Sequence, residues 1–574
     1  MTGQTDVEKE VRGEPEHEGA LGQTTSANNN NKRNNSNRNY YDKRKGKGKT
    51  TNDPSWYSKY PELLESSSNL NYSDPFGQPI KWKDWTDAGN HVYKTTSNTV
   101  NRAFPGVAAI KTKPSFGFND NSLSPINVAA NALYVNIRHK VSGRKNYDPV
   151  DVMLYMGAIS EIYSFVNWAA RAYAMAFTAS QTNYYVMEGL AAAMQISLSS
   201  LRTNLSNFRM WLNSFIERVS AYAIPKGITY FDKKVSQYNY LYLENPDKNI
   251  KDQLYVYIPD GFFRFNVDGS NAGKLEYRKI GYGGPLSVND IINIGEDLIS
   301  TIWGDEDFGI MSGDMIKAYE GNIVGLSKIE DNAYLTPVYD ESSLLQIKNA
   351  TIVDSLDSTS GAVTLPTYTR TDGTADTWNP GEVVQNDKGL LLSYNSAYDG
   401  LGPNLAGHNM YLHQAKLMTQ LSPKPGLGDN IESSRLMIRK VKSLGNLGNM
   451  ELYALETGAY IITNIQYCVA YANGFDRHPS FGLFNGPTAN VIDMTAWLGS
   501  LQHLQIPNFK FYPSIFAIAY NVVGNDRELQ YGYLVNGCEN YTWVDDETLG
   551  KMHLCAWLSM FHVDGVAMIK NSLL

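Results

Sequence analysis

The feature that most constrains the fold is a long apolar stretch from Val150 to Phe177. The stretch is long enough to cross a bilayer, but four polar or charged residues interrupt it: Asp151, Glu161, Asn167 and Arg171. Charges at the centre of a membrane are costly, so we expect a buried helix inside a large core and no membrane span. Asp148 is placed to cap this helix, and Pro149 suits its first turn.

A second long helix is predicted from Ser197 or Ser199 to Pro225, which would end it. Its apolar residues alternate steps of three and four along one face: Leu198, Leu201, Leu205, Phe208, Leu212, Phe215, Val219 and Tyr222. Such a stripe is typical of an amphipathic helix packed on a core. The two helices together predict a mainly helical domain.

The character of the chain changes after Tyr240. Strand-like runs at 254–258 and 262–265 flank a Pro-Asp-Gly turn, a short helical segment follows at 287–303, and residues 330–430 are rich in Thr, Ser, Gly, Asp and Pro. Helical patterns return at 431–441, 450–471 and 489–504, before a strand-like stretch at 509–523 and a closing helix at 546–561. At 574 residues, two or more domains are expected.

This order of elements predicts an α+β protein in which a helical domain is interrupted by a β-rich module. We expect residues 52–245 and 435–574 to form the discontinuous helical domain, with residues 246–434 inserted as the β-rich domain. Residues 1–51 are predicted to be a disordered N-terminal arm, because they contain almost nothing apolar to bury.

The arm is divided by charge. Residues 1–20 hold six acidic and two basic residues, a net charge of −4, whereas residues 28–50 hold eight basic residues and one acidic residue, a net charge of +7. Since the whole chain carries −8, the part beyond the arm carries −11. A solvated tail that only aids solubility would not require this segregation.

A flexible polycation suits non-specific binding to phosphate backbones, because each cationic side chain can release condensed counterions wherever it lands. We predict that the basic side chains of the arm contact nucleic acid. They are Lys32, Arg33, Arg38, Lys43, Arg44, Lys45, Lys47 and Lys49.

The composition of the body favours extensive contacts with other chains. Hydrophobic residues make up 42% and charged residues 19%, and there are 38 tyrosines, a residue type enriched at interfaces. The three cysteines, Cys468, Cys538 and Cys555, are widely spaced and form no CxxC pair, so we expect neither a disulfide framework nor a zinc site. No secretory signal is visible at the N-terminus.

Motifs of catalysis are weak throughout the chain. Residues 46–50 end like a phosphate-binding loop but lack its first glycine, and the acidic run 304–307 has no strand-turn-strand context. His408 and His413 lie five apart and His553 and His562 nine apart, neither with a metal-ligand set. Cys468 is expected in the core. We therefore predict no catalytic residue, no metal, no cofactor and no enzyme activity.

Four segments of the chain form a specific combination. The first is Asn52-Asp53-Pro54-Ser55-Trp56-Tyr57 with Pro61-Glu62-Leu63-Leu64 after it; the second is the helix that starts Asp148-Pro149-Val150-Asp151 and continues to Ala170-Arg171-Ala172-Tyr173. The others are Asn183-Tyr184-Tyr185-Val186 and Asn207-Phe208-Arg209. Together they resemble picobirnavirus capsid proteins, mainly over residues 52–265.

This resemblance implies a coat protein that forms homodimers and then a closed icosahedral shell, with a helical shell domain and a projecting domain at the dimer contact. The shell would enclose double-stranded RNA and the viral polymerase, in a virion assembled in the host cytoplasm. Three alternatives remain: the capsid of a related, partitivirus-like double-stranded RNA virus, a non-structural RNA-binding protein, and an enzyme acting on RNA or carbohydrate.

Overall fold

The structure is a computed structural model that describes residues 58–563, with internal gaps. The gaps are 71–78, 88–92, 104–105, 143–145, 180–183, 248–251, 268–271, 354–363, 400–416, 448–449, 472–473, 480–483, 488–508, 514–515, 524–525 and 535–539. The chain forms two compact units, Met1–Tyr72 and Ser73–Leu574. The predicted arm, residues 1–51, lies outside the described part.

In the first unit, the described residues form one short helix, α2 (Pro61–Ser68). Pro61 occupies its first turn, where the missing N–H costs nothing. None of its residues is buried, and Leu63 and Leu64 are 45% and 47% exposed.

The second unit is built around a mixed five-stranded sheet in the order β17-β16-β3-β5-β4. β3 pairs in parallel with β5, from Val107 opposite Leu254 onward, and antiparallel with β16. Nearly every described residue of β3 and β5 is buried, as expected for central strands covered on both faces. The strands are β3 (Val107–Pro114), β4 (Leu241–Leu243), β5 (Leu254–Pro259), β16 (Tyr460–Tyr471) and β17 (Gly474–Pro479).

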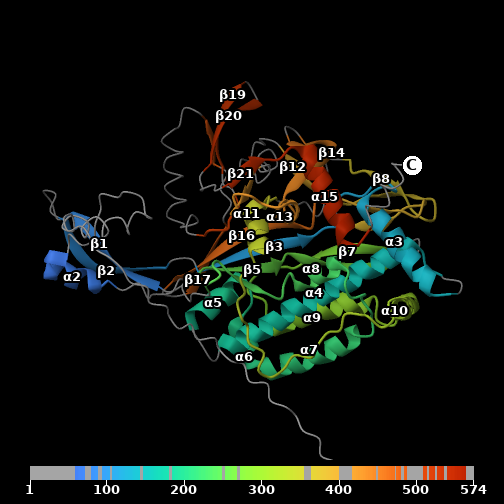
Figure 1. Cartoon of the computed structure of the whole chain (residues 1–574), viewed down its shortest axis with the longest axis horizontal. Coiled ribbons are helices and arrows are strands. Elements are labelled where there is room, and N and C mark those ends of the chain that lie inside the picture. The colour runs from blue at the N-terminus through green and yellow to red at the C-terminus, as the bar shows by residue number, and fades with distance from the viewer. Residues whose placement is uncertain are drawn as a thin grey trace, which may run out of the picture. The chain divides into compact units, whose positions relative to one another are not determined.

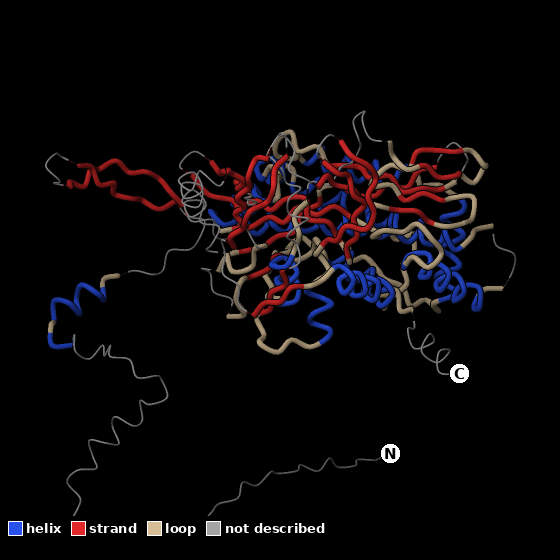
Figure 2. The backbone as a smooth tube through the Cα atoms, turned by 90° about the horizontal axis from the view of Figure 1, so that it is seen from above, coloured by secondary structure: helices blue, strands red, loops and turns tan. Residues whose placement is uncertain are grey.

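Helices lie along one side of this sheet, with α4 (Pro149–Ala179) next to the strands and α9 and α7 beyond it (Figure 1). Seen from above, the strands cover much of the helical part of the unit (Figure 2). Besides α4, the helices of this part are α3 (Pro125–Lys140), α5 (Tyr184–Ala193), α6 (Leu198–Thr203), α7 (Leu205–Val219), α8 (Thr229–Ser236), α9 (Val288–Ser300) and α10 (Glu306–Ala318).

α4 confirms the prediction of a buried helix. Its start at Pro149 is fixed by the carboxylate of Asp151, which accepts a hydrogen bond from the backbone N–H of Asp148 at 2.9 Å. Phe165 and Trp168, in the middle of the helix, are fully buried. Of the helices among the described residues, none has the length and apolarity to cross a bilayer.

The predicted single helix up to Pro225 was wrong: the segment forms two helices, α6 and α7, separated at Asn204, and α7 ends at Val219. The predicted apolar stripe is confirmed on these two helices. Leu198 and Leu201 of α6 are buried, and so are Phe208, Leu212, Phe215 and Val219 of α7. The side chain of Ser197 caps α6 by accepting a hydrogen bond from the N–H of Ser200.

Further sheets surround this core. A four-stranded sheet has the order β11-β10-β7-β6, and β12-β15-β14 form a three-stranded sheet. Their strands are β6 (Gly261–Val267), β7 (Gly273–Lys279), β10 (Val383–Gln385), β11 (Leu391–Ser393), β12 (Asn395–Asp399), β14 (Ile438–Leu447) and β15 (Met450–Thr457).

The remaining elements form smaller sheets and three helices. The strands pair as β1 (Pro79–Asp87) with β2 (Tyr93–Ala103), β8 (Thr367–Thr369) with β9 (Ala375–Thr377), β13 (Leu417–Gln420) with β21 (Asn540–Trp543), and β18 (Phe484–Pro487), β19 (Phe516–Val523) and β20 (Asp526–Leu534) together. The helices are α11 (Glu341–Asn349), α13 (Leu427–Ser433) and α15 (Asp546–Met560).

Two other predicted helices were wrong. Residues 450–471 form strands β15 and β16. Of residues 431–441, only 431–433 are helical, at the end of α13, and 438–441 belong to β14. For β16 the error has a physical cause: a central strand buried on both faces is a continuous apolar run, which cannot be told from a buried helix by its periodicity. The predicted helix at 489–504 lies outside the described residues.

The α+β class is confirmed, with helices and sheets sharing one hydrophobic core. The closing helix is confirmed as α15. The proposed border near residue 245 falls between β4 and β5, which pair with each other in the central sheet. The division into a shell domain and an inserted domain stays a prediction.

Candidate functional surfaces and buried ionic groups

The predicted nucleic-acid site is the basic part of the arm. All eight of its cationic residues, Lys32, Arg33, Arg38, Lys43, Arg44, Lys45, Lys47 and Lys49, lie outside the described residues. Their role therefore stays a prediction from charge alone. The glycine- and lysine-rich run 46–50 lies outside the described part as well.

The acidic run 304–307 has a structural role in the fold. Asp305 is the N-cap of α10, and its side chain accepts a hydrogen bond from the N–H of Phe308 at 3.1 Å. Glu306 and Asp307 follow in the first turn, where negative charge is favourable beside the helix dipole. The run is the start of a helix, which explains its composition without a metal ion.

His553 and His562 each lie beside a polar group of the fold. His553 is fully buried, its Nε2 lies 3.3 Å from the carbonyl oxygen of Ser434, and burial lowers its pKa to about 3. His562 Nε2 lies 3.2 Å from the hydroxyl of Thr229. Across the described residues, no three His, Cys, Asp or Glu side chains are grouped to hold a metal ion. His408 and His413 lie outside this part.

The cysteines give no sign of a reactive site in the described part. Cys555 is a free, exposed thiol on α15. The side chains of Cys468 and Cys538 are outside the described residues, so the prediction that Cys468 is a core residue stays untested.

The apolar core contains an ion pair that sequence analysis did not identify. Glu161 of α4 and Lys234 of α8 contact each other with side chains only 2% and 5% exposed. The backbone N–H of Phe263 donates to Glu161 Oε2 at 3.3 Å, and Lys234 Nζ lies 5.0 Å from the ring centroid of Tyr460. Burial raises the pKa of Glu161, against the effect of Lys234. Such a pair is costly to break on one side only.

A second ionic group lies next to it. Lys233 of α8 and Arg435, which follows α13, both approach the carboxylate of Glu432. Burial lowers the pKa of Lys233. Burial would raise the pKa of Glu432, but Arg435 and Lys233 hold it below its ordinary value. The one sequence signal for these pairs is the charge of Glu161 inside a mostly apolar helix.

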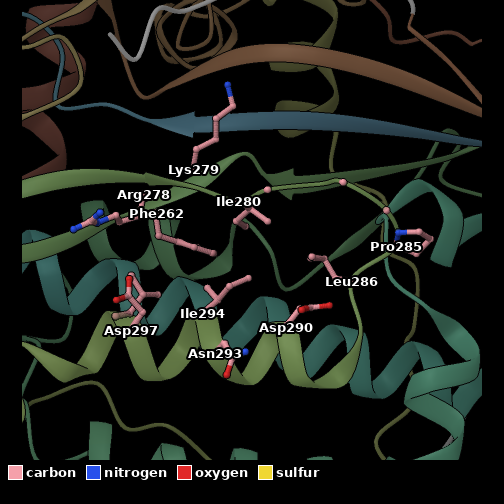
Figure 3. A pocket seen from close by; sticks show the side chains of 14 residues that line it. Phe262, Arg278, Lys279, Ile280, Pro285, Leu286, Asp290, Asn293, Ile294 and Asp297 are labelled. Carbon is pink, nitrogen blue, oxygen red and sulfur yellow. The ribbon is translucent and has the colours of Figure 1, made fainter.

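A surface cavity of ≈ 500 Å³ lies between α9 and the segment that follows β7 (Figure 3). Phe262, Ile280 and Ile294 point toward one another in its centre, whereas Lys279 points away (Figure 3). The acidic side chains at its ends have structural partners. Asp290 is in the capping box of α9 with Ser287, and Asp297 Oδ1 lies 3.4 Å from Arg264 Nε.

This cavity brings no nucleophile and base together, so it fits an apolar contact better than catalysis. The second unit also exposes large apolar side chains at other places on its surface. Those more than half exposed are Leu123, Val135, Met210, Trp303, Tyr334, Leu427, Tyr541 and Trp543. Exposed apolar groups of this size are suited to contacts with other chains.

Three comparisons place the chain among known proteins. A family model described as the picobirnavirus capsid protein matches residues 56–455. A capsid protein precursor of human picobirnavirus is 27% identical over 541 residues, which covers 90% of this chain and 91% of that protein.

A solved structure is similar as well. An X-ray crystallographic structure of the picobirnavirus capsid matches with a TM-score of 0.67 and 19% identity, over 89% of this chain and 98% of that chain. At this identity the match supports the fold, while the family model, which spans well over half of the sequence, decides the family. The chain belongs to the picobirnavirus capsid protein family.

Proposed function

We propose that this capsid protein associates through homodimers into a closed icosahedral shell around a double-stranded RNA genome. The observation that carries the proposal is the family match over residues 56–455, supported by the likeness of the fold to a solved picobirnavirus capsid. Proteins of this family are structural components of the virion and are not enzymes. Family membership favours this proposal over a partitivirus-like capsid.

Assembly would be driven by burial of apolar and tyrosine-rich surface between subunits. The exposed apolar side chains of the second unit and of α2 support this. We extend the proposal to the two-part organisation: residues 52–245 and 435–574 would form the shell, and residues 246–434 the projecting domain at the dimer contact. The short strands β8 to β12 fall inside the latter range.

Inside the shell, the basic arm would neutralise RNA phosphates without recognising bases. Its net charge of +7 over residues 28–50, on a body that carries −11, supports this role. The same particle would package the viral polymerase, and assembly would take place in the host cytoplasm.

Electron microscopy of the purified full chain tests the proposal. Closed shells are expected. A chain that stays monomeric at high concentration would rule out the capsid role and favour a non-structural RNA-binding protein.

The arm is tested by replacing its eight Lys and Arg residues with Gln. Shells should still form, but they should retain much less RNA, because each lost phosphate contact removes counterion release that favours binding. The salt dependence of RNA binding should become weaker as well. Deletion of residues 1–20 is the matched control, since it removes negative charge from the same arm. The control should retain at least as much RNA as the unaltered chain.

A further inference from the structure

A small, partly open cavity lies where six distant segments of the second unit meet. Its volume is ≈ 20 Å³, more than the ~10–15 Å³ that a single water requires and too little for a phosphate group. It is lined from α8, α11, α15, the residue after β3, the second residue after α13, and the turn between β15 and β16 with the start of β16. Its lining residues are Ser115, Tyr230, Lys233, Lys234, Gln237, Gln346, Arg435, Ala459, Tyr460, Trp557 and Met560.

The lining is rich in hydrogen-bond donors. Three of these residues are cations, Lys233, Lys234 and Arg435, and two more are amides, Gln237 and Gln346. None of the described residues that line the cavity is a carboxylate. Water accepts and donates equally well, whereas a lining of cations and N–H groups matches an acceptor that carries negative charge.

The cations around the cavity are not equally well paired. Lys234 pairs with Glu161, while Lys233 and Arg435 share the carboxylate of Glu432. The charge of Asp340 also acts on Lys233, which is partly exposed, whereas the carboxylate beside Arg435 is the shared one of Glu432. Arg435 is only 6% exposed, and a poorly compensated charge at such depth is costly.

Of the three cations, Arg435 has the poorest set of hydrogen-bond acceptors. Its Nη1 lies 3.5 Å from Glu432 Oε2, beyond the length of a good hydrogen bond, and Nη2 donates to the sulfur of Met560, a weak acceptor, at 3.0 Å. Its Nε is buried and has no hydrogen-bond partner among the described residues. A buried guanidinium with an unpaired N–H group is expected to bind another hydrogen-bond acceptor.

We propose that the cavity binds one small monovalent anion, of the chloride class, beside Arg435. The anion would supply the missing acceptor and would offset the charge of the buried guanidinium. It would also connect α8, α11, α15 and the segment of Arg435, which are far apart in the sequence. The folded protein is then stabilised by chloride through mass action.

The site is tested directly by crystals of the full chain in which bromide replaces chloride. An anomalous difference peak within hydrogen-bond distance of Arg435 Nε supports the proposal. Density with the height of a water and without an anomalous signal overturns it. This measurement uses the unaltered chain and does not depend on any variant.

Thermal unfolding tests the energetic consequence. In sodium chloride the melting temperature should rise by on the order of 1–2 °C for each tenfold increase above the dissociation constant, relative to sodium gluconate of equal ionic strength. The same temperature in the two salts at every concentration up to about 1 M would contradict the proposal.

Arg435→Met should abolish the difference between the two salts, because it removes the guanidinium that would hold the anion. Arg439→Met is the matched control. Arg439 pairs with Glu456 on neighbouring strands and does not line the cavity, so this variant should keep the full chloride effect. A chloride effect that survives in Arg435→Met would assign it to another part of the protein.

Discussion

Helices α4 and α2 differ in what surrounds them. α4 has 31 residues and runs through the core, where Phe165 and Trp168 have no exposed surface. α2 has 8 residues and none of them is buried. An isolated helix shorter than ~12–15 residues is marginal in water. The comparison teaches that contacts within this chain stabilise α4. The apolar side chains of α2 are exposed and remain available for a contact with another chain.

The largest effect is expected where α4 carries a buried charge. Glu161→Ala should lower the free energy of unfolding by ~3–5 kcal/mol, because it leaves Lys234 buried without its partner. Urea unfolding measures the loss. The control is Glu217→Ala on α7, which removes an exposed pair with Lys328 and should cost at most ~1 kcal/mol. Equal losses in the two variants would contradict the importance of burial.

A glycine on α9 tests how tightly α4 is packed. A Cβ added at Gly295 would lie 2.6 Å from Phe165 Cε1 of α4, so Gly295→Ala should destabilise the protein by ~1–3 kcal/mol through overpacking.

The matched control is Gly309→Ala on α10, where a Cβ meets nothing within 4 Å. It should stabilise the helix by ~0.5–1 kcal/mol, because alanine loses less conformational freedom than glycine. Differential scanning calorimetry should show shifts of opposite sign for the two variants. Shifts of the same sign would mean that the interface of α4 and α9 can relax.

Helix α15 is intermediate, with buried and exposed faces, and its buried face carries His553. Burial holds the pKa of His553 near 3, below its ordinary value of 6.5. The unfolded chain therefore binds more protons between these two values. The contribution of neutral His553 to the free energy of unfolding is fully present above pH 6.5. It is lost as the pH falls below this value, at up to ~1.4 kcal/mol per pH unit.

Chemical unfolding at pH 7.0, 6.0 and 5.0 measures this dependence. His553→Gln should be less stable at pH 7, since a buried contact with Ser434 is altered, but its stability should fall less between pH 6 and 5. His562→Gln is the control, because His562 is exposed and lies two residues beyond the end of α15. The same slope in all three proteins would show that His553 does not carry the acid dependence.

Local sequence predicted the elements whose pattern is local. α4 and α7 were identified from apolar spacing and from Pro149, and both are confirmed. β16 was predicted as a helix, because its apolar run gives no period and its strand character depends on pairing with β3, more than 300 residues away. Sequence could suggest a basic arm from charge, but no local signal brings Lys233 and Arg435 to one cavity.

The smallest effect on folding, and a large one on assembly, is expected in α2. Leu63→Ser with Leu64→Ser should change the stability of the unassembled chain by less than ~0.5 kcal/mol, because both side chains are already exposed. If each leucine becomes buried between subunits, its loss removes ~1.5–3 kcal/mol of contact energy. The concentration needed for particle formation should then rise at least ~10-fold.

Light scattering and electron microscopy across a concentration series measure this threshold. The control variant is Glu62→Gln with Glu65→Gln, which changes two exposed polar residues of the same helix and should leave the threshold nearly unchanged. An unaltered threshold in the leucine variant would mean that the apolar side chains of α2 make no contact in the particle. A drop in the stability of the unassembled chain would mean instead that α2 packs on its own chain, and its contrast with α4 would disappear.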